Sequence, residues 1–172
     1  HAALLPTGEI LYFGGDQHSP GAHAANDIDH TRTFDTISNT IVRHSSPTTD
    51  IFCSGHAFLG DGRLLVGGGT EQWGDGGDAG HPHELNFGGH RACWIFDPAT
   101  HRWSQVASMN TEPGQVSGGG RWYPTLITLP SGEVLAVFGH PSRIGSSEHR
   151  NNRPELYSPS QNTWRRLAEI AA

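Results

Sequence analysis

The sequence predicts an all-β protein assembled from repeated four-stranded units. Two recurring motifs carry this prediction: a hairpin with a glycine in its turn, and an aromatic-containing second half that follows it. The composition agrees, since the 172 residues include 23 glycines and 11 prolines, 34% of them are hydrophobic, and no long helical pattern is present. Such a composition is typical of many short strands joined by turns, and the length suffices for one domain with a core.

The hairpin motif occurs three times, in the segments 4–15, 58–69 and 128–140. These read LLPTGEILYFGG, FLGDGRLLVGGG and TLPSGEVLAVFGH, and their turn glycines are Gly8, Gly62 and Gly132. Each segment has an apolar stretch, a polar turn, a second apolar stretch and a glycine break. This order predicts a β-hairpin, and the nearly continuous apolar second stretch is typical of a buried strand.

A second motif follows each hairpin, in the segments 33–41, 95–103 and 156–164. Each contains an aromatic residue, a turn, and a large apolar residue seven positions after the aromatic one. The pairs are Phe34 with Ile41, Phe96 with Trp103, and Tyr157 with Trp164. Proline follows Asp97 and Ser158, and it sets φ for the first central position of a turn. The motif therefore adds two strands to each unit.

Four-stranded units of this kind look like the blades of a kelch-type β-propeller. One such sheet cannot bury both faces alone, so blades stack around an axis. We expect a single partial propeller domain over 1–172, with three blades at approximately 1–45, 50–108 and 118–170. Propellers close with about four to eight blades, so we expect either a fragment completed by the rest of a longer chain or further copies that close the ring. A generic antiparallel sandwich is the alternative fold.

Comparison of the repeats in register brings two residues into equivalent places. Cys53 lies nine residues before Gly62, and Tyr123 lies nine residues before Gly132. Both therefore stand at the start of the first strand of their blades. Because first strands surround the propeller axis, we expect Cys53 and Tyr123 to be close in space.

The neighbours of this pair admit simpler roles. Alternation along a strand places Trp122 on the face opposite Tyr123, where it would pack within the blade. Arg121 could line the mouth of the channel, bind backbone carbonyls or face solvent. Cys93 is expected to be a packing residue.

The stretches TDIFCSGHAFLGDGRLLVGGGT and GGGRWYPTLITLPSGEVLAVFGH, together with FDPATHRW and MNTEPGQ, resemble the radical copper oxidases. This is the family of galactose oxidase and glyoxal oxidase; the glyoxal oxidase-like branch is the more similar, and the resemblance covers essentially the whole chain. It implies a thioether bond between Cys53 and Tyr123, with Tyr123 also a copper ligand and the redox-active phenol. The implied reaction is oxidation of an aldehyde or primary alcohol, with dioxygen reduced to hydrogen peroxide.

Copper(II) favours nitrogen and oxygen ligands in a tetragonal arrangement, and a phenolate supplies one. The family pattern also requires a second tyrosine with an adjacent histidine, and one more histidine. Tyr12 and Tyr157 have no histidine neighbour, so this chain alone lacks most copper ligands, and we expect them further along a longer chain. The stretch after the tyrosine hairpin, where galactose oxidases carry a stacking aromatic residue, reads His140-Pro141 here.

Charge and hydropathy exclude some partners. The net charge is −6, with no basic stripe for nucleic acid, and no apolar run is long enough to span a membrane. The resemblance implies a small-molecule aldehyde or alcohol substrate and an extracellular location. The alternative is a non-catalytic kelch-type module whose loops bind carbohydrate or protein.

The loop histidines are a further candidate. They are His18, His23, His30, His81 and His83. A His-x-His pair could bind a metal ion, and solvated or loop-ordering roles are the alternative.

Overall fold

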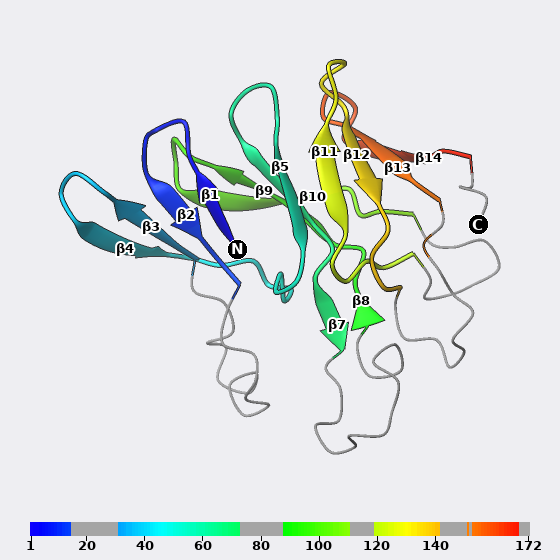
Figure 1. Ribbon diagram of the computed structural model, residues 1–172, viewed down its shortest axis with the longest axis horizontal. Coiled ribbons are helices and arrows are strands. Elements are labelled where there is room, and N and C mark those ends of the chain that lie inside the picture. The colour runs from blue at the N-terminus through cyan, green and yellow to red at the C-terminus, as the bar shows by residue number, and fades with distance from the viewer. Residues whose placement is uncertain (15–30, 73–87, 111–118, 142–150, 152, 169–172) are drawn as a thin grey trace.

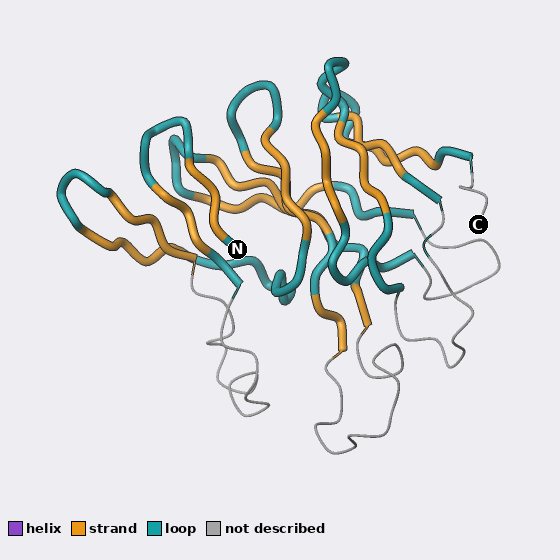
Figure 2. Tube along the Cα trace, in the orientation of Figure 1, coloured by secondary structure: helices purple, strands orange, loops and turns teal. Residues whose placement is uncertain are grey.

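The computed structural model describes residues 1–14, 31–72, 88–110, 119–141, 151 and 153–168. Within these ranges the regular structure consists of β-strands joined by turns, and no helix is present (Figure 2). The prediction of an all-β fold is confirmed.

Twelve of the strands form three antiparallel sheets of four strands each, in chain order. The first sheet contains β1 (Ala2–Leu4), β2 (Ile10–Tyr12), β3 (Thr31–Asp35) and β4 (Thr40–His44). The second contains β5 (Gly55–Phe58), β6 (Leu64–Gly67), β9 (Cys93–Asp97) and β10 (Arg102–Val106). The third contains β11 (Thr125–Thr128), β12 (Val134–Val137), β13 (Glu155–Ser158) and β14 (Thr163–Arg166). A small fourth sheet pairs β7 (Thr70–Gln72) with β8 (Gly88–Gly89).

Each four-stranded sheet is a meander, and the three stand one after another in an open arc (Figure 1). This arrangement agrees with part of a propeller. The predicted limits of the blades include residues outside the described ranges, so those limits stay predictions.

The local signals in the sequence have their expected structural counterparts. The turn glycines adopt left-handed backbone conformations, with φ of 89° at Gly8, 86° at Gly62 and 83° at Gly132. The aromatic and apolar residues paired by spacing are cross-strand neighbours. The pairs are Phe34 opposite Ile41, Phe96 opposite Trp103, and Tyr157 opposite Trp164.

The second sheet is covered on both faces. Leu64 and Val66 pack into a cluster shared with the first sheet, which includes Leu11 and Phe13. On the opposite face, Leu65 and other residues pack into a cluster shared with the third sheet. That second cluster includes Cys93, Ile95, Leu126, Val134, Ala136, Tyr157 and Trp164. The continuous apolar run of β6 is thus explained by burial on two sides.

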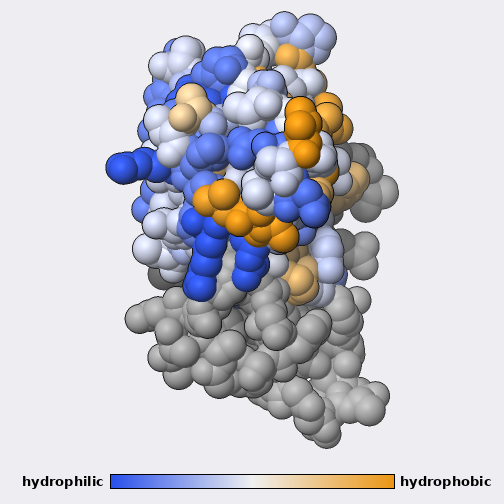
Figure 3. Space-filling view, turned by 90° about the vertical axis from the view of Figure 1, so that its left-hand side faces the viewer, coloured by the Kyte–Doolittle hydropathy of each residue, from blue (hydrophilic) through white to orange (hydrophobic). Residues whose placement is uncertain are grey.

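The two outer sheets each have a face without a neighbouring sheet among the described residues. Leu4 and Ile41 of the first sheet are 67% and 61% exposed, and Ile127 of the third is 46% exposed. Figure 3 shows apolar surface surrounded by polar residues at the end of the arc where the first sheet lies. Among the described residues, no helix is long and apolar enough to cross a membrane.

Candidate functional site

Cys53 and Tyr123 meet between the second and third sheets. Each lies two residues ahead of the first strand of its sheet, β5 or β11, and these strands lie side by side (Figure 1). The backbone N–H of Tyr123 donates a hydrogen bond of 2.7 Å to the carbonyl oxygen of Cys53. The two residues also share a left-handed conformation, with φ of 59° and 58°. The structure therefore brings together the pair that the repeat register identified.

The two side chains differ in exposure. Cys53 is 2% exposed and Tyr123 is 58% exposed. Burial raises the pKa of the Cys53 thiol, and hydrogen bonding with Tyr123 partly opposes that shift. The same hydrogen bond, followed by burial, raises the pKa of the Tyr123 phenol. Before any oxidation, both groups are therefore protonated at neutral pH, with the thiol enclosed and the phenol accessible to small molecules.

The position of Trp122 differs from the prediction that it would lie on the face opposite Tyr123. The two rings are in edge-to-face contact, with centroids 4.5 Å apart and planes at 70°. Alternation of side chains requires extended backbone, and the left-handed φ of Tyr123 interrupts it. The predicted packing role of Trp122 holds, since its ring is 5% exposed and its Nε1–H donates to Thr70 Oγ1 at 3.2 Å.

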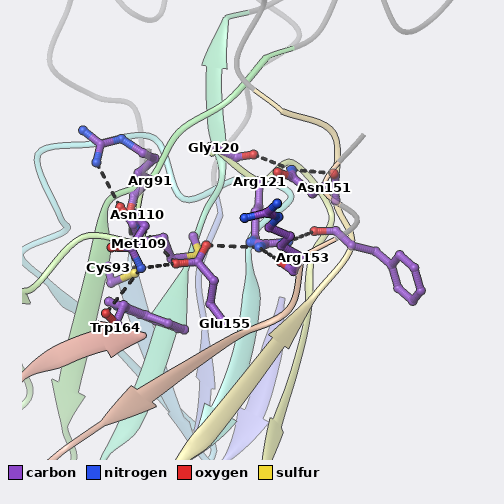
Figure 4. A network of polar contacts seen from close by, with 12 residues as sticks. Arg91, Cys93, Met109, Asn110, Gly120, Arg121, Asn151, Arg153, Glu155 and Trp164 are labelled. Atoms are coloured by element: carbon purple, nitrogen blue, oxygen red, sulfur yellow. Dashed lines mark hydrogen bonds and ion pairs between the residues drawn. The ribbon is translucent and has the colours of Figure 1, made fainter. Parts of the chain in front are cut away.

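Arg121 is fully buried, which excludes the solvated alternative and agrees with carbonyl binding. Its Nη1 donates to the carbonyl oxygen of Phe138 at 2.6 Å, and Nη2 donates to that of Arg153 at 2.8 Å. Nη2 also forms an ion pair of 3.1 Å with Glu155 (Figure 4). A buried guanidinium requires such partners, because an unpaired buried charge is costly.

Glu155 connects this arginine to the segment that follows β10, the last strand of the second sheet. Its other oxygen, Oε2, accepts hydrogen bonds from the backbone N–H of Asn110 at 2.9 Å and from Asn110 Nδ2 at 2.7 Å. On the opposite side of Arg121, Asn151 Nδ2 donates to the carbonyl oxygens of Gly120 and Gly139, at 2.7 and 2.8 Å (Figure 4). Sequence reasoning missed these residues. One signal in the sequence could have found Glu155. It lies two positions before Tyr157, so alternation along the strand places this acidic residue on the core-facing side.

His90 was also missed, and it supports the segments of both Cys53 and Tyr123. Its Nε2 lies 2.7 Å from the carbonyl oxygen of Asp50, and its own carbonyl oxygen accepts from the backbone N–H of Arg121 at 3.1 Å. Burial lowers the pKa of His90, so its ring is neutral. Since a carbonyl oxygen only accepts, Nε2 carries the ring proton.

Cys93 has the packing role that was predicted. It is fully buried among the residues between the second and third sheets, and burial raises the pKa of its thiol to about 12. The candidate loop histidines lie outside the described residues. They are His18, His23, His30, His81 and His83.

The donor set within the described ranges does not complete a copper site. The Tyr123 oxygen is a suitable ligand for copper(II), but the described residues contain no group of three or more histidine, cysteine, aspartate or glutamate side chains that could hold a metal ion. A copper site that used Tyr123 would need ligands from elsewhere.

Comparison with known proteins supports the fold. No protein-family model matches this sequence, and no curated protein matches it. Among solved structures, the chain is similar to a fungal alcohol oxidase of the AA5 family in complex with copper, with a TM-score of 0.63 and 20% sequence identity. The match covers 95% of this chain and 29% of that chain. At this identity the match establishes a shared fold, and the chain spans less than a third of the length of the oxidase it resembles.

Proposed function

We propose that this chain supplies the cysteine and tyrosine of a copper-radical oxidase, as three blades of a larger propeller. The observation that carries the proposal is the contact between Cys53 and Tyr123 across two adjacent sheets. The similarity of the fold to a copper-containing alcohol oxidase supports it. The sequence resemblance to glyoxal and galactose oxidases supplies the reaction.

The pair can form a covalent cofactor. A thioether would join Cys53 Sγ to a ring carbon of Tyr123 next to the hydroxyl, with loss of one hydrogen from the thiol and one from the ring. Dioxygen accepts the two electrons and two protons and becomes hydrogen peroxide. Sulfur on the ring donates electron density and makes the phenol easier to oxidise, which suits a redox-active side chain.

The whole protein would oxidise a primary alcohol to an aldehyde, or a hydrated aldehyde to an acid. Each oxidation removes two electrons and two protons, and dioxygen takes them up as hydrogen peroxide. Copper, when bound, supplies one-electron redox chemistry beside the phenol. From this chain, Tyr123 would provide an oxygen ligand, and Cys53 would modify its ring. An extracellular location belongs to the same proposal.

Mass spectrometry of the full-length protein tests the cofactor. After exposure to copper(II) and air, we expect a loss of two hydrogens from the intact mass and a cross-linked peptide that contains Cys53 and Tyr123. Cys53→Ala and Tyr123→Phe should both abolish the cross-link. The matched controls Cys93→Ala and Tyr12→Phe should retain it. An unmodified Cys53 that alkylates freely after this treatment would favour the non-catalytic module, as would the absence of peroxide with every aldehyde and alcohol tested.

A further inference from the structure

The buried ion pair of Arg121 and Glu155 adjoins the segment that carries Tyr123, because Arg121 precedes Tyr123 by two residues. The two side chains are 1% and 3% exposed, and their charged atoms are 3.1 Å apart. Buried ion pairs are weak sources of stability, because desolvation offsets much of their attraction, and some are retained to fix one conformation. What this pair fixes can be read from its hydrogen bonds.

Arg121 and Asn151 join three separate stretches of backbone. Arg121 binds the carbonyl oxygens of Phe138 and Arg153, and Asn151 binds those of Gly120 and Gly139 (Figure 4). These hydrogen bonds connect the end of β12, at Val137, to the segment that precedes β11. His140 continues this contact, since it exchanges two backbone hydrogen bonds with Trp122, of 2.8 and 2.7 Å.

The backbone leading to Tyr123 also has hydrogen bonds of its own to the segments around the second sheet. The N–H of Arg121 donates to His90, its carbonyl oxygen accepts from Gly69 at 3.0 Å, and the N–H of Tyr123 donates to Cys53. The Tyr123 side chain itself is more than half exposed. Its orientation toward Cys53 therefore depends on the backbone that carries it, including the left-handed φ of 58°.

We propose that Arg121 and Glu155, with Asn151, are positioning residues that hold Tyr123 against Cys53. The pair acts through the backbone of residues 120–123 and touches neither the thiol nor the phenol in this role. The expected slowing of cross-link formation in variants of these residues rests on the proposed function. The expected exposure of the Cys53 thiol in the same variants does not depend on it.

The first test uses the reduced, metal-free full-length protein in a Cys93→Ala background, where the rate of Cys53 alkylation by iodoacetamide reports its enclosure. We expect Arg121→Met, Glu155→Gln and Asn151→Ala each to raise this rate about tenfold or more. Because residues of one network act together, the double variant Arg121→Met/Glu155→Gln should add little to either single change. The double variant also removes both charges. It can therefore still be measured if a single variant fails to fold because it leaves one buried charge unpaired.

Val134→Ala is the matched control. Val134 is fully buried in the same sheet, so its truncation lowers stability without touching the network. In folded Val134→Ala protein, the rate of Cys53 alkylation should stay within about twofold of the parent, since the packing defect lies outside the Tyr123 segment. Equal rates for the network variants and the parent would overturn the proposal.

The second test measures the rate of cross-link formation after addition of copper(II) in air, followed by intact mass. The network variants should form the cross-link at least about tenfold more slowly than the parent, and Val134→Ala at the parental rate. If the parent forms the cross-link and the network variants match its rate, the positioning proposal is wrong while the proposed function stands. If the parent forms none and the variants still expose Cys53, positioning is supported and the proposed function is wrong.

Discussion

Gly68 shows how closely the second and third sheets approach behind the candidate site. Its φ is 74°, and a Cβ at this position would meet the carbonyl oxygen of Arg121. Gly8 is a matched control, because its φ is 89° and nothing lies within 4 Å of where its Cβ would be.

A comparison of two alanine variants measures this close approach. Gly8→Ala should cost about 1 kcal/mol, the penalty of a left-handed conformation for a residue with a side chain. Gly68→Ala should cost about 2 kcal/mol more, since overpacking adds to the same strain. The free energies of unfolding in urea would give both values. Equal losses of unfolding free energy in the two variants would show that the second and third sheets move apart to accommodate the added methyl group.

At the scale of single residues, the repeat register was sufficient to pair Cys53 with Tyr123. Both lie at equivalent positions, and an internal repeat carries positional information that a lone residue lacks. The contact between Trp122 and Tyr123 could not be predicted, because it depends on a left-handed φ at a non-glycine residue. The ion pair between Arg121 and Glu155 could not be predicted either, since Glu155 is far away in sequence and comes close only when β13 forms.

At the scale of elements, the first and second sheets meet at a group of titratable side chains. His44 of β4 stacks on His101 with ring centroids 4.6 Å apart, and His101 Nε2 lies 3.0 Å from Glu9 Oε2. Burial, then the proximity of His101, lowers the pKa of His44 below 6.5. The hydrogen bond with His101 is the main cause that lowers the pKa of Glu9 below 4.5.

Both shifts make this interface sensitive to acid. A group with a lowered pKa in the folded state stabilises the fold above its unfolded pKa, and that stability is lost as the pH falls. Stability should therefore decline below pH 6.5 through His44 and decline further below pH 4.5 through Glu9. Denaturation measured across this range, with His44→Gln as comparison, tests the assignment. The variant should lose less stability than the parent between pH 6.5 and pH 4.5, and it should keep the decline below pH 4.5. The remaining decline in the upper range belongs to His90 and His56, because burial also lowers their pKa values below 6.5.

The hairpins themselves were predictable, because each has its own local signal. A turn glycine at Gly62 and a proline after Asp97 specify where the chain reverses, and alternation or continuity of apolar residues specifies burial. The small sheet of β7 and β8 had no such signal. It lies in the long connection between β6 and β9, and glycines form one of its two strands.

At the scale of the whole molecule, the open arc leaves apolar sheet faces at both ends. Ile41 and Ile127 lie on opposite ends and are more than 40% exposed. Contiguous exposed apolar surface promotes association, so the isolated 172-residue chain should self-associate with increasing concentration. Ile41→Thr/Ile127→Thr should reduce the average mass measured by light scattering.

Ile37→Thr is the control for this experiment. Ile37 is 96% exposed, but it lies in the turn between β3 and β4 and belongs to no sheet face, so its replacement should leave association unchanged. A parent chain that stays monomeric at every concentration would show that neither face is adhesive. The number of sheets in a complete ring was beyond prediction, since within the described ranges the core clusters join each sheet to the adjacent one, and no local signal encodes closure.

The burial of β6 on both faces has a consequence for how the molecule opens. All four residues of this strand are buried, and it is hydrogen-bonded to β5 on one side and β9 on the other. Its amides should therefore exchange with deuterium only through global unfolding, whereas those of the edge strand β4 should exchange through local fraying. The exchange rates of the β6 amides would then give the free energy of global unfolding of the three stacked sheets.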